Sequence, residues 1–197
     1  MNCLAHIYLS GDSTEILLGN FMGDDIKGKN YLNYPNAVQK GILLHRLIDT
    51  ETDSHPDTKS VKQLLRSEFG IFSGIITDIF FDYFLAKNWN AFHSENLKEY
   101  AQQKYRILNE NKYMLPKKTA FMLTYMMKND WLYSYRLEAG IERALSGMGQ
   151  RISSRPKLET AMPLLVAHHS EIQERFQSVI SHLQSICFDY LTQETTN

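Results

Sequence analysis

The chain of 197 residues contains little cysteine, proline or glycine: 2, 5 and 10 residues, respectively. Two cysteines, Cys3 and Cys187, cannot build the disulfide framework of a small secreted domain, and we expect both to be reduced thiols. The scarcity of proline and glycine argues against a many-turned β fold and against disorder. The length fits one domain over residues 1–197, with a frayed tail at 192–197.

The small net charge and the short apolar runs argue against further classes of protein. The net charge is −1, so no overall field recruits nucleic acid. The opening MNCLAHIYLS has neither the basic region nor the long apolar region of a secretion signal. No run of about 18 uninterrupted apolar residues indicates a membrane span. We therefore expect a cytoplasmic protein without nucleic-acid or membrane partners, while its oligomeric state stays open.

Apolar residues recur with helical spacing along the whole chain, which predicts an all-α, single-domain helical bundle. The glycine- and serine-rich segment 146–157 interrupts this pattern and is predicted to be a functional loop. The predicted helices cover Ser13 to Gly28, 36–52, 58–67, 71–86, 94–108, 117–128, 134–147 and 159–191.

The helix predicted at 71–86 is almost entirely apolar, except for Asp78 and Asp82. Their spacing of four places both carboxylates on one helix face. Burying such a pair costs several kcal/mol, roughly, unless each carboxylate is paired or bound to a metal. Three interpretations stay open: a divalent metal, ion pairs with arginines of other helices, or a face that meets solvent.

The helix predicted at 36–52 carries a similar stripe of Gly41, His45 and Asp49, followed one turn later by Asp53. A histidine and a carboxylate at this spacing can bind one ion, and additional carboxylates favour the harder metals. A lone His45 would more often be a hydrogen-bonded core residue, but the two aspartates weaken that alternative. Arg46 stands beside the stripe and could contact a phosphate.

Two further segments add polar candidates. The first predicted helix places Asn20, Asp24 and Lys27 on one stripe, and Asp24 could be a ligand, a residue that orients a ligand, or a surface residue. Asp25 points elsewhere and is predicted to be a surface residue. His6 lies in an apolar segment and could be a ligand, a general acid or a packing residue.

Several catalytic classes lack their motifs. The chain has no Glu-x-x-His, His-Glu-x-x-His, Walker loop or Gly-x-Ser-x-Gly. An aspartate-rich site with a histidine and nearby Arg46 and Lys27 fits metal-assisted phosphoester hydrolysis. In such a site a divalent ion polarises a phosphoryl oxygen, while basic side chains stabilise the charge that spreads over the phosphoryl oxygens.

Taken in order, these segments resemble the acyl carrier protein phosphodiesterase family. The resemblance runs from Met1 to about the start of the last helix, and its most specific piece is GILLHRLIDTETDSHP. The matching residues are Asn2, Leu4, Ala5 and His6; Gly19, Asn20 and Asp24; Gly41, His45, Arg46, Ile48, Asp49, Thr52, Asp53 and Pro56; Asp78, Asp82, Phe84, Leu85 and Trp89; and Trp131, Tyr135, Arg136, Gly147, Met148, Arg155 and Pro156.

The resemblance implies a fold related to the HD-domain phosphohydrolases, of which this family is an atypical branch. One departure from ordinary HD domains is that no histidine here is followed by aspartate. The implied activity is hydrolysis of the phosphodiester that joins 4′-phosphopantetheine to a serine of holo-acyl carrier protein. The implied cofactor is a divalent metal, with Mn expected and Mg or Fe as alternatives.

We therefore expect a metal site with catalytic side chains and a basic surface for the acidic carrier protein. The first rival hypothesis is an HD-type phosphohydrolase that acts on a nucleotide or another small phosphoester. The second is a non-enzymatic helical module whose carboxylates pair with Arg46, Arg136 or Arg143. The expected catalytic residues are His6, Asp24, Lys27, His45 and Arg46; the metal ligands are Asp24, His45, Asp49, Asp78 and Asp82; and the carrier-binding residues are Lys29, Arg151, Arg155 and Lys157.

Overall fold

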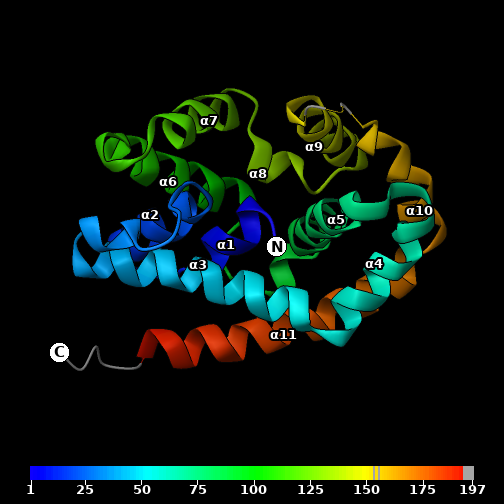
Figure 1. Cartoon of the computed structure of the whole chain (residues 1–197), viewed down its shortest axis with the longest axis horizontal. Coiled ribbons are helices and arrows are strands. Elements are labelled where there is room, and N and C mark those ends of the chain that lie inside the picture. Colours follow the sequence, from blue (N-terminus) through cyan, green and yellow to red (C-terminus); the bar gives the residue numbers. More distant parts are fainter. Residues whose placement is uncertain (153, 155, 193–197) are drawn as a thin grey trace.

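The computed structural model describes residues 1–152, 154 and 156–192, and within them every regular element is a helix. The predicted all-α bundle is therefore confirmed (Figure 1). The α-helices are α1 Cys3–Tyr8, α2 Thr14–Met22, α3 Asn36–Ser54, α4 Pro56–Phe69, α5 Ser73–Lys87, α6 Leu97–Glu110, α7 Lys117–Lys128, α8 Trp131–Ser134, α9 Glu138–Arg151, α10 Met162–Ala167 and α11 His169–Thr192. The 3₁₀ turns are η1 Gly23–Asp25, η2 Asn30–Asn33, η3 Gly70–Phe72, η4 Trp89–Ala91, η5 Lys112–Met114 and η6 Leu158–Ala161.

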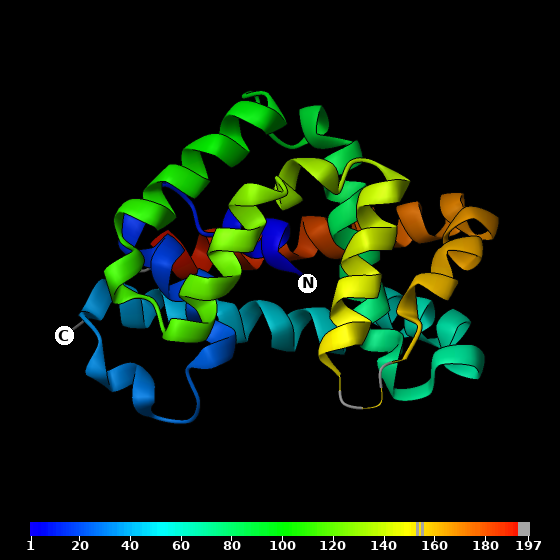
Figure 2. The ribbon, with the colours of Figure 1, turned by 90° about the horizontal axis from the view of Figure 1, so that it is seen from above.

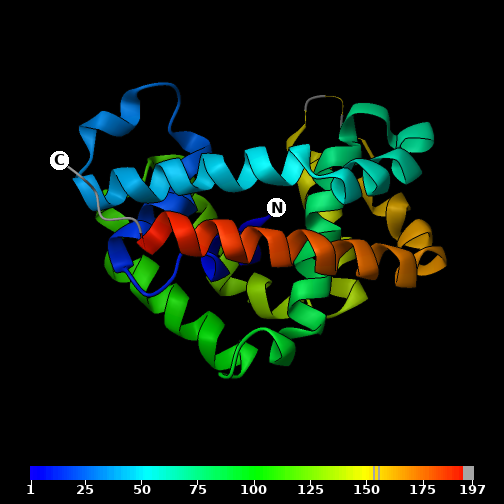
Figure 3. The ribbon, with the colours of Figure 1, turned by 90° about the horizontal axis from the view of Figure 1, so that it is seen from below.

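The two longest helices, α3 and α11, lie side by side and run in opposite directions along one side of the molecule (Figures 1 and 3). Polar contacts join them near both ends. His182 Nε2 lies 3.2 Å from Glu51 Oε2, and the Tyr190 hydroxyl donates to the Lys40 carbonyl at 3.1 Å. Helices α1, α2 and α5 pack against this pair.

Helix α5 lies in the core, where it contacts α1, α4, α9 and α11. The stretch Pro56–Lys87 is long and apolar enough to cross a membrane by length and composition, but 61% of its most apolar window is buried inside the protein. The 3₁₀ turn η3 divides this stretch, and Gly70 there has a φ of 51°. These observations fit two helices, α4 and α5, that pack against each other.

Helices α2 and α3 cross with their backbones in contact, because both carry glycine at the crossing point. A Cβ atom on Gly19 would lie 2.1 Å from the Val38 carbonyl oxygen, and one on Gly41 would lie 2.2 Å from that of Ile16. Since any larger residue would force the helices apart, these glycines set the distance between Asn20 and His45. The space that Gly41 leaves is occupied by α2.

The N-terminal helices differ from the prediction in two ways. Residues 3–8 form a helix that was not predicted, and α2 ends at Met22, well before Gly28. The chain turns after Met22 because Asp25 is anchored to α7, where it accepts hydrogen bonds from the Lys118 ammonium and the Thr119 hydroxyl. The prediction that Asp25 is a surface residue is therefore wrong, since only 14% of its side chain is exposed.

The prediction of a functional loop at 146–157 is also wrong for the first half of this segment. Helix α9 continues through Gly147 and Gly149 to Arg151. Gly149 is required here, because a Cβ atom would lie 2.2 Å from the Pro156 carbonyl oxygen where the chain returns along α9.

The helix predicted at 159–191 is divided. Residues 158–161 form η6, and α10 ends at Ala167. The backbone of the next residue, His168 (φ −110°, ψ 23°), leaves helical geometry before α11 begins. Thr192 is the last residue of α11 rather than part of a frayed tail, and residues 193–197 lie outside the described residues.

Candidate metal centre

Three side chains from two helices meet beside the N-terminus of the chain. His6 of α1 and His45 and Asp49 of α3 offer ligand atoms that all lie within 4.8 Å of one another. His6 Nε2 is 3.1 Å from Asp49 Oδ1, and His45 Nε2 is 3.2 Å from Asp49 Oδ2. The two imidazole rings stack with centroids 4.1 Å apart. The structure therefore brings together two of the predicted ligands, His45 and Asp49, with the candidate His6.

Asn20 of α2 orients both rings. Its backbone carbonyl lies 2.8 Å from His45 Nδ1, so that nitrogen carries the proton and donates. Its side-chain Nδ2 donates to the His6 carbonyl at 2.8 Å and to Ser10 Oγ at 2.9 Å, which turns Oδ1 toward His6 Nδ1 at 2.9 Å. Both histidines thus donate through Nδ1 and turn Nε2 toward Asp49. A metal that displaces the proton from Nε2 would find the ring orientation that is typical of metal-binding histidines.

One further observation indicates that this site can hold a divalent metal. His45 Nε2 is buried, and among the described residues it has no hydrogen-bond partner. Asp49 at 3.2 Å and Asp24 at 3.5 Å are close, but neither is aligned for a hydrogen bond. A buried nitrogen without a partner costs about 1–3 kcal/mol, whereas a metal would use its lone pair. Two imidazoles with a carboxylate suit Mn, Fe or Zn.

The charges of these groups depend strongly on one another. Burial lowers the pKa of His45, but Asp24 and Asp49 outweigh this effect and raise it to about 9. Burial lowers the pKa of His6. Burial favours neutral Asp49, yet the side chains of His45 and His6, whose Nε2 atoms lie 3.2 and 3.1 Å from its oxygens, bring its pKa well below the ordinary value. The nearby His45 imidazole also lowers the pKa of Asp24, so both carboxylates are anionic at neutral pH.

The three residues face a hollow of about 290 Å³. We call it the acidic hollow, because Asp24, Asp49, Asp53 and Asp78 line it while none of its described lining residues is lysine or arginine. The α-amino group of Met1 donates to Asp78 Oδ1 at 2.9 Å at the edge of this space. Four carboxylates repel an anionic phosphodiester unless a cation offsets their charge.

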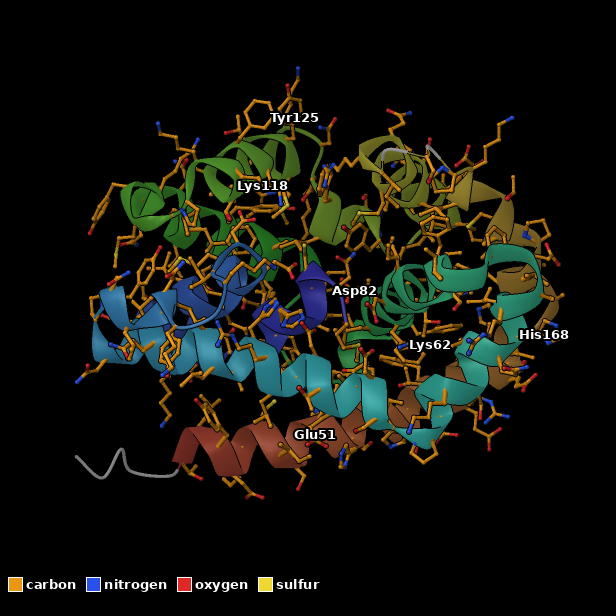
Figure 4. All side chains as sticks on the ribbon, viewed as in Figure 1. Glu51, Lys62, Asp82, Lys118, Tyr125 and His168 are labelled. Carbon is orange, nitrogen blue, oxygen red and sulfur yellow. The ribbon has the colours of Figure 1, made fainter. Side chains whose placement is uncertain are left out.

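The structure does not bring Asp82 into the cluster. Its side chain is fully buried on α5 and accepts hydrogen bonds from the backbone N–H groups of Leu4 at 2.7 Å and Ala5 at 3.1 Å. Figure 4 shows Asp82 in the interior, next to α1. Burial raises its pKa to about 7, although the two N–H donors partly oppose the rise. Asp82 thus holds the start of the short helix that carries His6.

The predicted phosphate-binding side chains also lie elsewhere. Arg46 Nη2 donates to the carbonyls of Ile26 at 2.9 Å and Gly28 at 2.8 Å, and its guanidinium lies over the Tyr31 ring. Arg46 therefore fixes the loop after η1. Lys27 in that loop is exposed, and neither basic residue lines the acidic hollow.

Sequence reasoning missed the role of Gly23. A Cβ atom there would lie 2.3 Å from His45 Cγ, so glycine is needed to leave room for the imidazole ring. The available signal was the repeated pattern of glycine before a polar residue, Gly19-Asn20 and Gly23-Asp24, at a spacing of four. The pattern places two glycines on the stripe that faces α3.

Comparisons with known proteins show the family of this chain. No solved structure matches the chain. Curated relatives named acyl carrier protein phosphodiesterase include one from Enterobacter sp. (strain 638), 29% identical over 180 residues, and one from Salmonella agona (strain SL483), 31% identical over 184 residues. Each alignment covers 89% of this chain and 92% of the relative. The sequence model of the family described as acyl carrier protein phosphodiesterase matches residues 1–183, and the chain belongs to this family.

Proposed function

We propose that this phosphodiester hydrolase uses a divalent metal, held by His6, His45 and Asp49, to release 4′-phosphopantetheine from holo-acyl carrier protein. The family and the names of its relatives support the reaction. The observation that carries the metal is the buried Nε2 of His45, which has no hydrogen-bond partner among the described residues and lies beside a second oriented histidine. The products are apo-acyl carrier protein and 4′-phosphopantetheine.

Asp24 and Asp78 are the proposed additional oxygen ligands. Asp24 Oδ1 is 3.5 Å from His45 Nε2, with 86% of the side chain exposed, so this carboxylate can move toward an ion without crossing packed atoms. Asp78 lines the acidic hollow from α5. Added carboxylates favour a hard ion, and we propose Mn, with Mg or Fe as alternatives. When bound, such an ion polarises a phosphoryl oxygen and lowers the pKa of water.

The contacts of His6 bear on its part in the reaction. Its Nδ1 is held by Asn20, and its Nε2 faces Asp49 within the cluster. A histidine with both nitrogens engaged has none left to protonate the departing serine oxygen. We therefore assign His6 to metal binding rather than to general acid catalysis, and assign Arg46 and Lys27 to no step.

The carrier protein is acidic, so its docking surface should be basic. Of the residues predicted for this role, Lys29, Arg151 and Lys157 are exposed, and Arg155 lies outside the described residues. We propose α7 as a further docking surface. Residues 111–129 contain four lysines and no acidic residue.

The outer face of α7 also offers apolar contacts. Phe121 is 65% exposed and Tyr125 46% exposed, and their ring centroids are 4.9 Å apart. Tyr125 projects from the edge of the molecule in Figure 4. Exposed aromatic rings between lysines match a partner surface that is acidic but has apolar contact points. Charge complementarity would speed the encounter, and the rings would supply buried area.

We also propose that the protein works in the cytoplasm. Cys3 and Cys187 are both free thiols, as predicted, and a reducing compartment preserves them. The relation to HD-domain phosphohydrolases stays a prediction, because no solved structure matches the chain.

The decisive assay is the intact mass of holo-acyl carrier protein after incubation with the purified protein and Mn. We expect loss of the phosphopantetheine mass, blocked by EDTA and by His45→Gln. Loss that persists after complete metal removal would refute the metal proposal. If several holo-carriers stay intact while the protein binds metal and cleaves a small phosphoester, the carrier assignment is wrong. If the protein does neither and binds no metal, a non-enzymatic module remains.

A further inference from the structure

A second hollow of about 130 Å³ opens next to the acidic hollow. It lies where the N-terminal end of α1 meets α5 and the helices α7 to α9, and Figure 2 shows the N-terminus between α7 and α9. Asn2, Ile79 and Met148 line both spaces. A ligand that reaches the metal centre can therefore extend past these three residues into the second hollow.

The second hollow differs chemically from the first, and we call it the apolar hollow. None of its described lining residues is a carboxylate, in contrast to the four in the acidic hollow. Its charged lining residues, Arg143 and Arg151, are exposed and belong to its rim. The remaining wall combines apolar side chains with a few neutral polar ones, including Met122, Trp131, Tyr135, Asn2, Ser134 and Cys3.

Gly147 of α9 keeps this space open. Gly140, which also lines the hollow, is required by packing, because a Cβ atom there would lie 2.0 Å from the Ser134 carbonyl oxygen. At Gly147 a Cβ atom would meet nothing within 4 Å. A glycine inside a helix costs about 1 kcal/mol relative to alanine. Packing therefore does not require glycine at 147, and because this residue lines the apolar hollow, a large side chain there would take up part of that space.

The size of the hollow limits its occupant. Pockets for compact small molecules usually measure at least about 300 Å³, so a hollow of about 130 Å³ encloses only part of a ligand of that size. A slender chain can enter such a space over part of its length. Below the two arginines of the rim, the described wall suits a chain without charge, since its apolar and neutral polar groups would not compensate the charge of a buried ion.

We propose that the apolar hollow binds part of the pantetheine arm of the substrate while the phosphodiester occupies the acidic hollow. This inference rests on the proposed function. The arm is a slender, uncharged chain with a dimethyl group, a hydroxyl, two amides and a terminal thiol. Apolar side chains would cover its carbon atoms, and neutral polar groups such as those of Asn2 and Ser134 would pair with its amides. The carrier protein then stays outside, on the side of the exposed rim.

The test fills the hollow from Gly147. Gly147→Leu adds a side chain into open space and should not lower helix stability, while Gly147→Val adds less volume should the leucine variant fail to fold. Gln150→Leu is the matched control, because Gln150 is exposed on the same helix and lines neither hollow. Thermal unfolding checks that each variant is folded.

Two binding probes separate the arm from the phosphate. With the Mn-loaded protein, we expect Gly147→Leu to weaken 4′-phosphopantetheine binding at least about tenfold and to leave inorganic phosphate binding unchanged. The kcat/KM for holo-carrier protein should fall by a similar factor, and Gln150→Leu should match the wild type in all three measurements.

Unchanged 4′-phosphopantetheine binding in a folded Gly147→Leu protein would overturn the inference. Equal loss of phosphate binding would overturn it as well, because the substitution would then act on the acidic hollow. Failure of the proposed function is seen separately, in a wild-type protein that leaves holo-carrier protein intact, and the inference would fall with it.

Discussion

Replacing Asn20 with leucine tests how the metal centre is positioned. Leucine has a similar volume but lacks hydrogen-bonding atoms, so the change removes the bonds from Asn20 to His6 Nδ1, the His6 carbonyl and Ser10 Oγ. At about 1 kcal/mol for each bond, the free energy of unfolding should fall by about 3 kcal/mol. His6 Nδ1 loses its contact with the Asn20 side chain, while the backbone carbonyl of residue 20 still orients His45.

The expected effect on metal binding follows from the lost orientation of His6. Loss of a group that orients a metal ligand typically weakens metal affinity 10- to 100-fold. We therefore expect Asn20→Leu to raise the Mn dissociation constant by that factor, measured by isothermal titration under conditions in which urea unfolding shows the variant to be folded.

Ser10→Ala is the matched control. Ser10 Oγ donates to the His6 carbonyl and accepts from Asn20, so its removal breaks two bonds and should lower stability by about 2 kcal/mol. The contact between Asn20 Oδ1 and His6 Nδ1 survives, and Mn affinity should stay within about threefold of the wild type. Wild-type affinity in folded Asn20→Leu, or equal losses in both variants, would refute the assignment of Asn20 as the positioning residue.

Three further predictions concern charge. Asp82→Asn should lower the free energy of unfolding by about 1–3 kcal/mol, because an amide N–H₂ replaces one acceptor of a backbone N–H, and Mn stoichiometry should stay unchanged by metal analysis. In the metal-free protein, the raised pKa of His45, about 9, means that the folded state keeps a proton the unfolded state releases near 6.5. Its stabilisation, full below pH 6.5, is lost as pH rises to 9; urea unfolding should show this slope in the wild type and not in His45→Gln. Lys117→Glu with Lys128→Glu should lower kcat/KM for holo-carrier at low salt about tenfold without changing phosphate binding, whereas Lys59→Glu on α4 should change neither.

The metal centre could be predicted in part because its central pair is local. His45 and Asp49 are one helical turn apart, so their meeting follows from helix geometry alone. Asp24 was recognised on one predicted stripe with Asn20, and His6 as a polar residue in an apolar segment, but their distances to His45 depend on the crossing of α2 and α3. That crossing is set by Gly19 and Gly41, whose close contacts no spacing rule reveals.

The helix ends were harder to predict, because distant contacts decide them. Helix α2 ends early where Asp25 is anchored to α7, about ninety residues away in the chain. Helix α9 continues past Gly147 and Gly149, although two glycines in a helix are individually unfavourable. Packing against the chain near Pro156 accounts for Gly149. Local propensity could not anticipate either outcome.

Asp78 and Asp82 show why identical spacing leads to different roles. Both face α1 from α5, yet Asp78 borders the acidic hollow and Asp82 ends beneath the first backbone N–H groups of α1. The group opposite each carboxylate decides its role. For Asp82 that group belongs to α1, which is too short to be predicted from periodicity. Because α1 carries His6, Asp82 supports the metal centre through the backbone. Loss of activity on replacing Asp82 would therefore resemble loss of a ligand, and only metal stoichiometry measured together with stability distinguishes the two roles.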